Sequence, residues 1–88
     1  MTVEKFEKIM ADDDIGGKLL SEEGCNVVKG ILIIQKYLPK SGICGAGHDI
    51  VYSVDIDDIV NAGITEEDAI YLRKLNWNIV EYNLACFV

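Results

Sequence analysis

The sequence of 88 residues lacks the features that mark membrane, secreted and disulfide-rich proteins. No apolar stretch reaches the roughly 18–20 residues that a membrane-spanning helix needs. The first residues, Met1–Lys5, lack the basic start and apolar centre of a signal peptide. The three cysteines, at positions 25, 44 and 86, are too few and too scattered for a disulfide framework, so reduced and mostly buried thiols are expected. We therefore expect a cytoplasmic protein that does not insert into a membrane.

Basic residues are scarce, above all in the second half of the chain. The net charge is −7, and residues 49–88 hold eight acids with only Arg73 and Lys74 to balance them, against seven acids and six bases in residues 1–48. Direct binding to nucleic acid is not expected, because no basic stripe is present to displace counterions from phosphates. The acidic half is compatible with a protein partner that has a basic surface, and simple solubility is the alternative.

The longest apolar run, residues 27–38, predicts a central helix over about 24–38. Its apolar positions recur at spacings of three and four. Ser21 or Asn26 can cap the start, and Pro39 ends the run. Gly30 lowers the helix propensity by about 1 kcal/mol relative to Ala. Four consecutive aliphatic residues at 31–34 predict a helix buried on more than one face, or alternatively one that contacts a second copy in a homodimer.

The remaining patterns predict a single α+β domain over residues 1–88, without a linker or repeat. Three further helices are expected to begin near Thr2, Asp55 and Thr65, over about 2–11, 56–62 and 66–75. Alternating residues and a terminal hairpin predict a three-stranded antiparallel sheet over about 49–54, 77–81 and 84–88. Its first strand should point Ile50, Tyr52 and Val54 to one side, and one face of the sheet should pack on the central helix. The glycine-rich residues 40–48 predict a loop.

The acids of the second half are the candidate partner-binding residues. They are Asp55, Asp57, Asp58, Glu66, Glu67, Asp68 and Glu81. The competing interpretation is local, because acids in the first turn of a helix stabilise that helix without any partner. The favoured hypothesis is a small interaction or regulatory protein that is not an enzyme and uses no cofactor.

An acidic stretch before the central helix predicts an alternative function. Residues 12–23 resemble a calcium-binding EF-hand loop, with Asp12 and Asp14 at positions 1 and 3 and Glu23 at position 12. Gly17 falls where such a loop requires glycine. The fifth position, Gly16, and the ninth, residue 20, offer no side-chain oxygen, so the match is degenerate. An acidic helix end followed by a glycine turn is the competing interpretation.

The glycine loop after the central helix carries the second alternative, a small ligand or thiol site. A thiol at Cys44 or Cys25 could form a nucleophile–base pair with His48 if the two side chains meet in space. Cys44 and His48 could alternatively supply two of the four ligands of a zinc site. Asp49 follows the chain's single histidine. Adjacent residues at a strand start point to opposite faces, so Asp49 is not expected to orient His48. A turn or capping role is the competing interpretation.

Four segments together resemble small uncharacterised acidic proteins of bacterial and phage genomes. They are Tyr37-Leu38-Pro39, His48-Asp49-Ile50-Val51-Tyr52, Thr65-Glu66-Glu67-Asp68 and Leu75-Asn76-Trp77, which span the last two-thirds of the chain. The resemblance implies a bacterial or phage source and the α+β architecture. It implies no activity.

Overall fold

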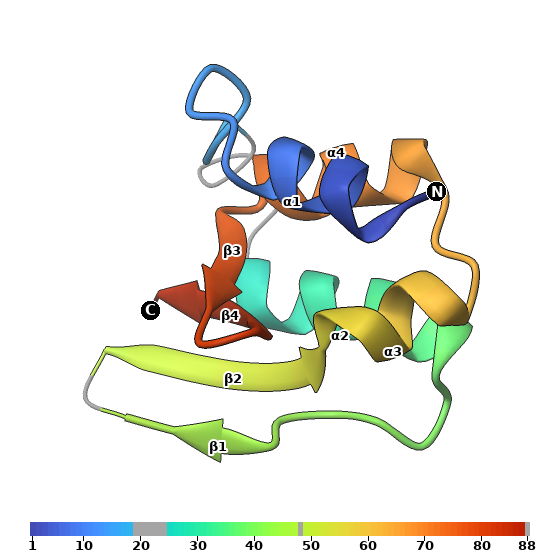
Figure 1. The fold of residues 1–88 in the computed structure, drawn as a ribbon. Coiled ribbons are helices and arrows are strands. Elements are labelled where there is room, and N and C mark those ends of the chain that lie inside the picture. The colour runs from blue at the N-terminus through green and yellow to red at the C-terminus, as the bar shows by residue number, and fades with distance from the viewer. Residues whose placement is uncertain (19–24, 48, 88) are drawn as a thin grey trace.

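The computed structural model describes residues 1–18, 25–47 and 49–87. It shows an α+β fold in which these residues form four helices and one four-stranded antiparallel sheet (Figure 1). The helices are α1 (Val3–Met10), α2 (Asn26–Tyr37), α3 (Ile56–Asn61) and α4 (Glu66–Lys74). The strands are β1 (Gly45–Ala46), β2 (Ile50–Asp55), β3 (Trp77–Val80) and β4 (Asn83–Phe87). The α+β class is confirmed, and the predicted three strands become four.

Three of the helices begin where the sequence predicts, each at a side-chain cap. The side-chain oxygens of Thr2, Asp55 and Thr65 accept hydrogen bonds from backbone N–H groups two or three residues further on, at 3.1, 2.8 and 3.1 Å. Such an oxygen satisfies a backbone donor that has no partner inside the helix. The chain leaves α4 through a left-handed residue, Asn76, which has a φ of 69°.

Helix α2 begins without a side-chain cap. Its N-cap residue, Cys25, makes no capping hydrogen bond. Asn26, one of the two expected caps, donates instead to the Leu75 carbonyl and to the Cys86 sulfur, each at 2.9 Å. The other expected cap, Ser21, lies outside the described residues. The start of α2 is therefore held by contacts with distant parts of the chain.

The burial of α2 is confined to one side. Gly30 and Ile34 are buried, and the helix contacts α4 and β2. On the opposite side, Val28 and Leu32 are 55% and 59% exposed. The expectation that this helix is buried on more than one face is wrong, because α1 packs mainly against α4, α3 and β3 instead.

The sheet has the strand order β1-β2-β4-β3, with all neighbours antiparallel (Figure 1). The last strand, β4, therefore lies between β2 and β3. The additional strand β1 pairs with β2 through Gly45 opposite Tyr52 and Ala46 opposite Val51. It falls in the segment predicted as a loop, because a two-residue strand of small residues has no periodicity to detect.

A register shift between Tyr52 and Asp55 changes which side chains of β2 are buried. Both Ser53 and Val54 are buried, and Val51 packs against the core. The prediction that Ile50, Tyr52 and Val54 share one face is therefore wrong past the shift, since an extra residue rotates the strand. The buried Ser53 hydroxyl is satisfied by donating to the carbonyl of residue 42 at 2.7 Å.

The turn between β3 and β4 has an unusual backbone. Its two central residues, Glu81 and Tyr82, both have positive φ values, 51° and 73°, as in the type I′ turns that favour Asn and Gly. The Tyr82 carbonyl accepts a hydrogen bond from the Ile56 N–H at 3.0 Å. The Asn83 side chain donates to the Ser53 carbonyl at 2.9 Å. The turn thereby joins the hairpin to the start of α3.

One apolar core connects the helices to the sheet. Trp77, fully buried at the start of β3, is its largest member. The other fully or almost fully buried members are Phe6, Met10, Ile34, Ile56, Ile59, Ile64, Ala69, Leu72, Leu75, Leu84 and Cys86. Ala69, Leu72 and Leu75 form the buried apolar stripe of α4 and its C-cap. Among the described residues, no helix has the length and apolar content to cross a membrane.

Candidate partner-binding groove

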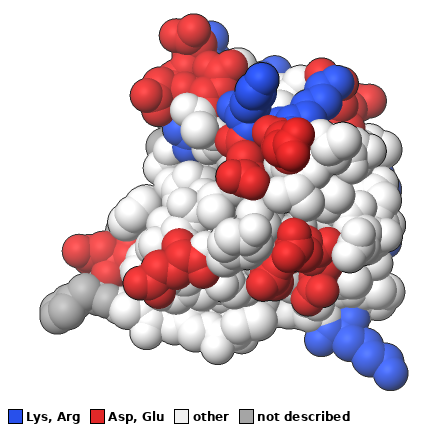
Figure 2. Space-filling model, viewed as in Figure 1, with Lys and Arg blue, Asp and Glu red and all other residues white. Residues whose placement is uncertain are grey.

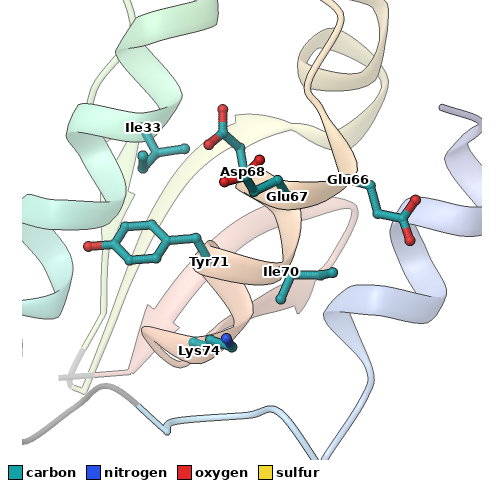
Figure 3. A pocket seen from close by; sticks show the side chains of 7 residues that line it. All are labelled: Ile33, Glu66, Glu67, Asp68, Ile70, Tyr71 and Lys74. Atoms are coloured by element: carbon teal, nitrogen blue, oxygen red, sulfur yellow. The ribbon is translucent and has the colours of Figure 1, made fainter.

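An open groove of about 650 Å³ lies between α2 and α4 (Figure 3). Its lining consists of Ile33 from α2 and Glu66, Glu67, Asp68, Ile70, Tyr71 and Lys74 from α4. The Thr65 cap places the three acids in the first turn of α4, and Lys74 lies in the last turn. The groove therefore has an apolar floor, an acidic end and a basic end, and three of the seven predicted partner-binding acids line it.

The three acids of the groove have different surroundings. Glu66 points toward α1 in Figure 3 and forms a salt bridge of 2.9 Å with Lys5, in which both side chains are more than half exposed. An exposed pair of this kind contributes little to stability. Glu67 is exposed, whereas the Asp68 side chain is only 15% exposed. Only Glu66 and Glu67 can therefore meet a partner without first losing a buried contact.

Asp68 is held by side chains from both helices. Its Oδ2 atom accepts hydrogen bonds from the Lys36 ammonium, at 2.8 Å, and from the Tyr37 hydroxyl. Hydrogen bonds from Lys36 and then Tyr37 lower the pKa of Asp68, and the same contact raises the pKa of Lys36. Tyr37 also accepts from the Thr65 N–H at 3.3 Å. This cluster fixes α2 against the start of α4, so Asp68 contributes to structure.

The other predicted partner-binding acids lie outside the groove. Asp55 caps α3, and its Oδ1 atom accepts from the backbone N–H of Asp57 at 2.8 Å. Asp57 and Asp58 are exposed in the first turn of α3, and Glu81 is exposed at the hairpin turn. None of these four lines the groove. The seven predicted partner-binding acids therefore do not form one surface. Three line the groove, and four lie at the start of α3 and at the hairpin turn.

The charge split along the sequence does not become a split between two sides of the molecule. Helix α1, which carries Lys5 and Lys8, packs against α4. Figure 2 shows acidic side chains in several separate groups on one face, with basic ones among them near the top, where Figure 1 places α1 and α4. Lower on that face, near β2 and α3, the charged groups are mostly acidic.

The described part of the proposed calcium loop is tied to the end of α4. The Asp12 carboxylate accepts from the Asp14 N–H at 2.9 Å, and the Asp12 carbonyl accepts from Arg73 Nε at 3.1 Å. Arg73 is buried, and its carbonyl accepts from the Gly17 N–H at 3.1 Å. Glu23 lies outside the described residues. Within residues 1–18, 25–47 and 49–87, no group of three His, Cys, Asp or Glu residues is arranged to hold a metal ion. Calcium binding stays a prediction.

The predicted ligand or thiol site is described only in part. Cys44 and Asp49 are exposed, and His48 lies outside the described residues, so their proposed meeting stays a prediction. The backbone N–H of Cys44 donates to the Tyr52 carbonyl at 2.8 Å. Cys44 also lines a hollow of about 300 Å³ beside the hairpin turn, together with Gly45, Tyr52, Glu81 and Asn83.

The three cysteines are free, as expected, but they are not mostly buried. Cys25 and Cys44 are exposed and only Cys86 is buried. Burial, with a smaller contribution from Cys25, raises the pKa of Cys86 to about 11. A thiol with this pKa is almost fully protonated at neutral pH, so Cys86 is a poor nucleophile.

The apolar floor of the groove was not singled out from the sequence. Ile33 belongs to the run of four aliphatic residues in the central helix, and Ile70 and Tyr71 lie beside the buried stripe of α4. The sequence does contain a signal for this floor, because Ile70 and Tyr71 are apolar or aromatic at positions outside the buried stripe of α4.

Comparison of the chain with protein-family models, with curated proteins and with solved structures gave no significant match. The resemblance to small bacterial and phage proteins therefore stays a prediction.

Proposed function

We propose that this protein is a small cytoplasmic interaction protein, of bacterial or phage source and without enzymatic activity, that binds a basic protein partner in the α2–α4 groove. The observation that carries the proposal is the combination of an apolar floor with carboxylates at one end. Such a site is suited to an amphipathic helix, which can place apolar anchors on the floor and Lys or Arg beside Glu66 and Glu67.

The charge of the whole chain supports the choice of partner. A net charge of −7 attracts a basic segment at long range and raises its association rate. The acids of α3 and Glu81 add to this attraction from outside the groove. In this form of the proposal, Glu66 and Glu67 determine where the partner docks, while Asp55, Asp57, Asp58 and Glu81 contribute mainly to steering.

The test uses a synthetic amphipathic peptide of about 15 residues, with leucines on one helical face and lysines on the other. Binding is measured by heteronuclear NMR titration, in which the signals of Ile33, Ile70 and Tyr71 are expected to shift. Reversal of both groove acids, Glu66→Lys with Glu67→Lys, should weaken binding by about tenfold, equivalent to about 1.4 kcal/mol. Higher salt should weaken it further.

The chain offers a matched control variant. Asp57→Lys with Asp58→Lys makes the same change of charge in the first turn of another helix, outside the groove. We expect this variant to bind the peptide within about threefold of the unaltered protein, since exposed charges that the ligand does not touch act only through a screened field. Equal weakening by both variants would contradict groove binding and would leave only a general attraction to the acidic surface. Shifts confined to residues outside the groove would also contradict it.

A further inference from the structure

A second apolar surface, partly exposed, lies along α2 and includes a residue of the segment that follows it. It consists of Val27, Val28, Ile31, Leu32 and Ile43, which we call the α2 patch, and it lines a hollow of about 310 Å³. Val28, Leu32 and Ile43 are 55%, 59% and 56% exposed. Single exposed apolar residues are ordinary, whereas several that line one hollow point to an interaction surface.

The α2 patch belongs to the part of the chain that has no acidic residue. Residues 25–47 contain three lysines, at positions 29, 36 and 40, and neither Asp nor Glu. All 15 acids of the chain lie elsewhere, with the other five basic residues, so the remainder carries a net charge of −10. The exposed aliphatic side chains of the α2 patch therefore all belong to a segment without acidic residues.

We propose that two copies of this chain form a two-fold symmetric dimer through the α2 patch. Each copy carries −7, so a contact that includes acidic surfaces of both copies is opposed by like-charge repulsion. Residues 25–47 bring no carboxylate of their own to such a contact. A two-fold axis uses the same patch on both copies, which pairs apolar surface with apolar surface.

The geometry of α2 fits this contact. Val28 and Leu32 are four residues apart, so they form one ridge along the helix that can pack into the groove of a second helix. An anionic membrane or an acidic protein would also meet the repulsion of a net charge of −7 and would lack this self-complementarity.

The size of the patch determines the kind of dimer. Helix α2 has 12 residues and is therefore about 18 Å long. A contact centred on one short helix buries less than the roughly 800 Å² per partner of a standard stable interface. We therefore expect a reversible dimer that forms as the protein concentration rises.

Sedimentation velocity of the full chain, over about 10 µM to about 1 mM, tests the proposal in the range where a small interface associates. We expect the weight-average mass to rise toward that of a dimer. Higher salt should strengthen the dimer, because it screens the repulsion between two acidic copies. This sign is opposite to the one expected for peptide binding in the α2–α4 groove.

Leu32→Lys is expected to abolish the dimer and to leave the melting temperature of the dilute protein unchanged, since Leu32 is mostly exposed. The matched control is Tyr82→Lys, which makes the same kind of change at a residue that is 54% exposed and lies outside the patch. A monomer at every concentration and salt level would overturn the proposal, as would a dimer that survives Leu32→Lys. Leu32→Lys should leave peptide binding in the groove intact, so the two proposals fail separately.

Discussion

Replacement of Gly30 by alanine should destabilise the protein, although alanine is the better helix former. Gly30 lies within α2, where the change to alanine normally gains about 1 kcal/mol. In this fold, a Cβ atom on Gly30 would lie closer than 3.0 Å to the Nε1, Cε2 and Cζ2 atoms of the Trp77 ring, with Cζ2 at 2.7 Å. The local preference and the tertiary packing therefore predict opposite signs.

The Trp77 ring has little freedom to move away. It is fully buried, its Nε1–H donates to the Asn26 carbonyl at 3.0 Å, and its own carbonyl accepts from Arg73 at 3.1 Å. Overpacking of a core costs about 1–3 kcal/mol, and loss of the buried Nε1 hydrogen bond costs a further 1–3 kcal/mol or so. With the helix gain subtracted, we expect the free energy of unfolding to fall by about 3 kcal/mol. This is a large share of the roughly 4–13 kcal/mol typical of a domain this size.

Urea denaturation followed by tryptophan fluorescence measures this change, because Trp77 is the only tryptophan and reports on the contact itself. Gly42→Ala is the control, since a Cβ atom there has no atom within 4 Å and should alter stability by less than about 1 kcal/mol. A smaller ring in the double variant with Trp77→Phe should reduce the penalty of Gly30→Ala. Because Trp77→Phe removes the only tryptophan, this coupling energy is measured by urea denaturation followed by circular dichroism. If Gly30→Ala instead stabilised the protein by about 1 kcal/mol, the packing argument would be refuted.

Two further predictions concern Asp68 and the hairpin turn. Asp68→Asn should lower the free energy of unfolding at pH 7 by about 1 kcal/mol, because it weakens the hydrogen bond that the Asp68 side chain accepts from Tyr37. The pKa of Asp68 is lowered in the folded protein, so this stabilisation is complete above the unfolded pKa of about 4 and disappears as the pH falls through the folded pKa. Thermal melts from neutral to acidic pH should therefore converge for the two proteins, and a constant difference would contradict the linkage. Glu81→Asn with Tyr82→Gly should stabilise the fold by about 1 kcal/mol, because it relieves two left-handed residues while keeping the carbonyl that bonds Ile56. A lower melting temperature would show that the replaced side chains contribute more than the backbone strain costs.

The sequence predicted the features of this fold that depend on local chemistry. Helices α1, α3 and α4 begin at Thr2, Asp55 and Thr65 because each supplies a capping oxygen, and neighbouring residues are sufficient to show this. The β3–β4 hairpin was likewise visible as two apolar runs joined by a short turn. The start of α2 depends on Asn26 bonding to residues some 49 and 60 positions away, so local reasoning could not find its true partners.

The candidate groove was predictable only in part. The three acids Glu66, Glu67 and Asp68 were recognised, because a charged first turn follows directly from the helix start. Their unequal roles were not predictable, since they depend on Lys36 and Tyr37 of α2 reaching Asp68 and on Lys5 of α1 reaching Glu66. Pairings between helices distant in sequence decide which acids remain available to a partner.

The strand order has a consequence for how the protein is made. Strands β2 and β3 are joined only through β4, which comprises Asn83–Phe87. The sheet cannot assemble until the ribosome has synthesised these residues and released them from its exit tunnel. Until then, β2 and β3 lack the strand that pairs with both of them. At a synthesis rate of roughly 5–20 residues per second, this exposed interval lasts seconds.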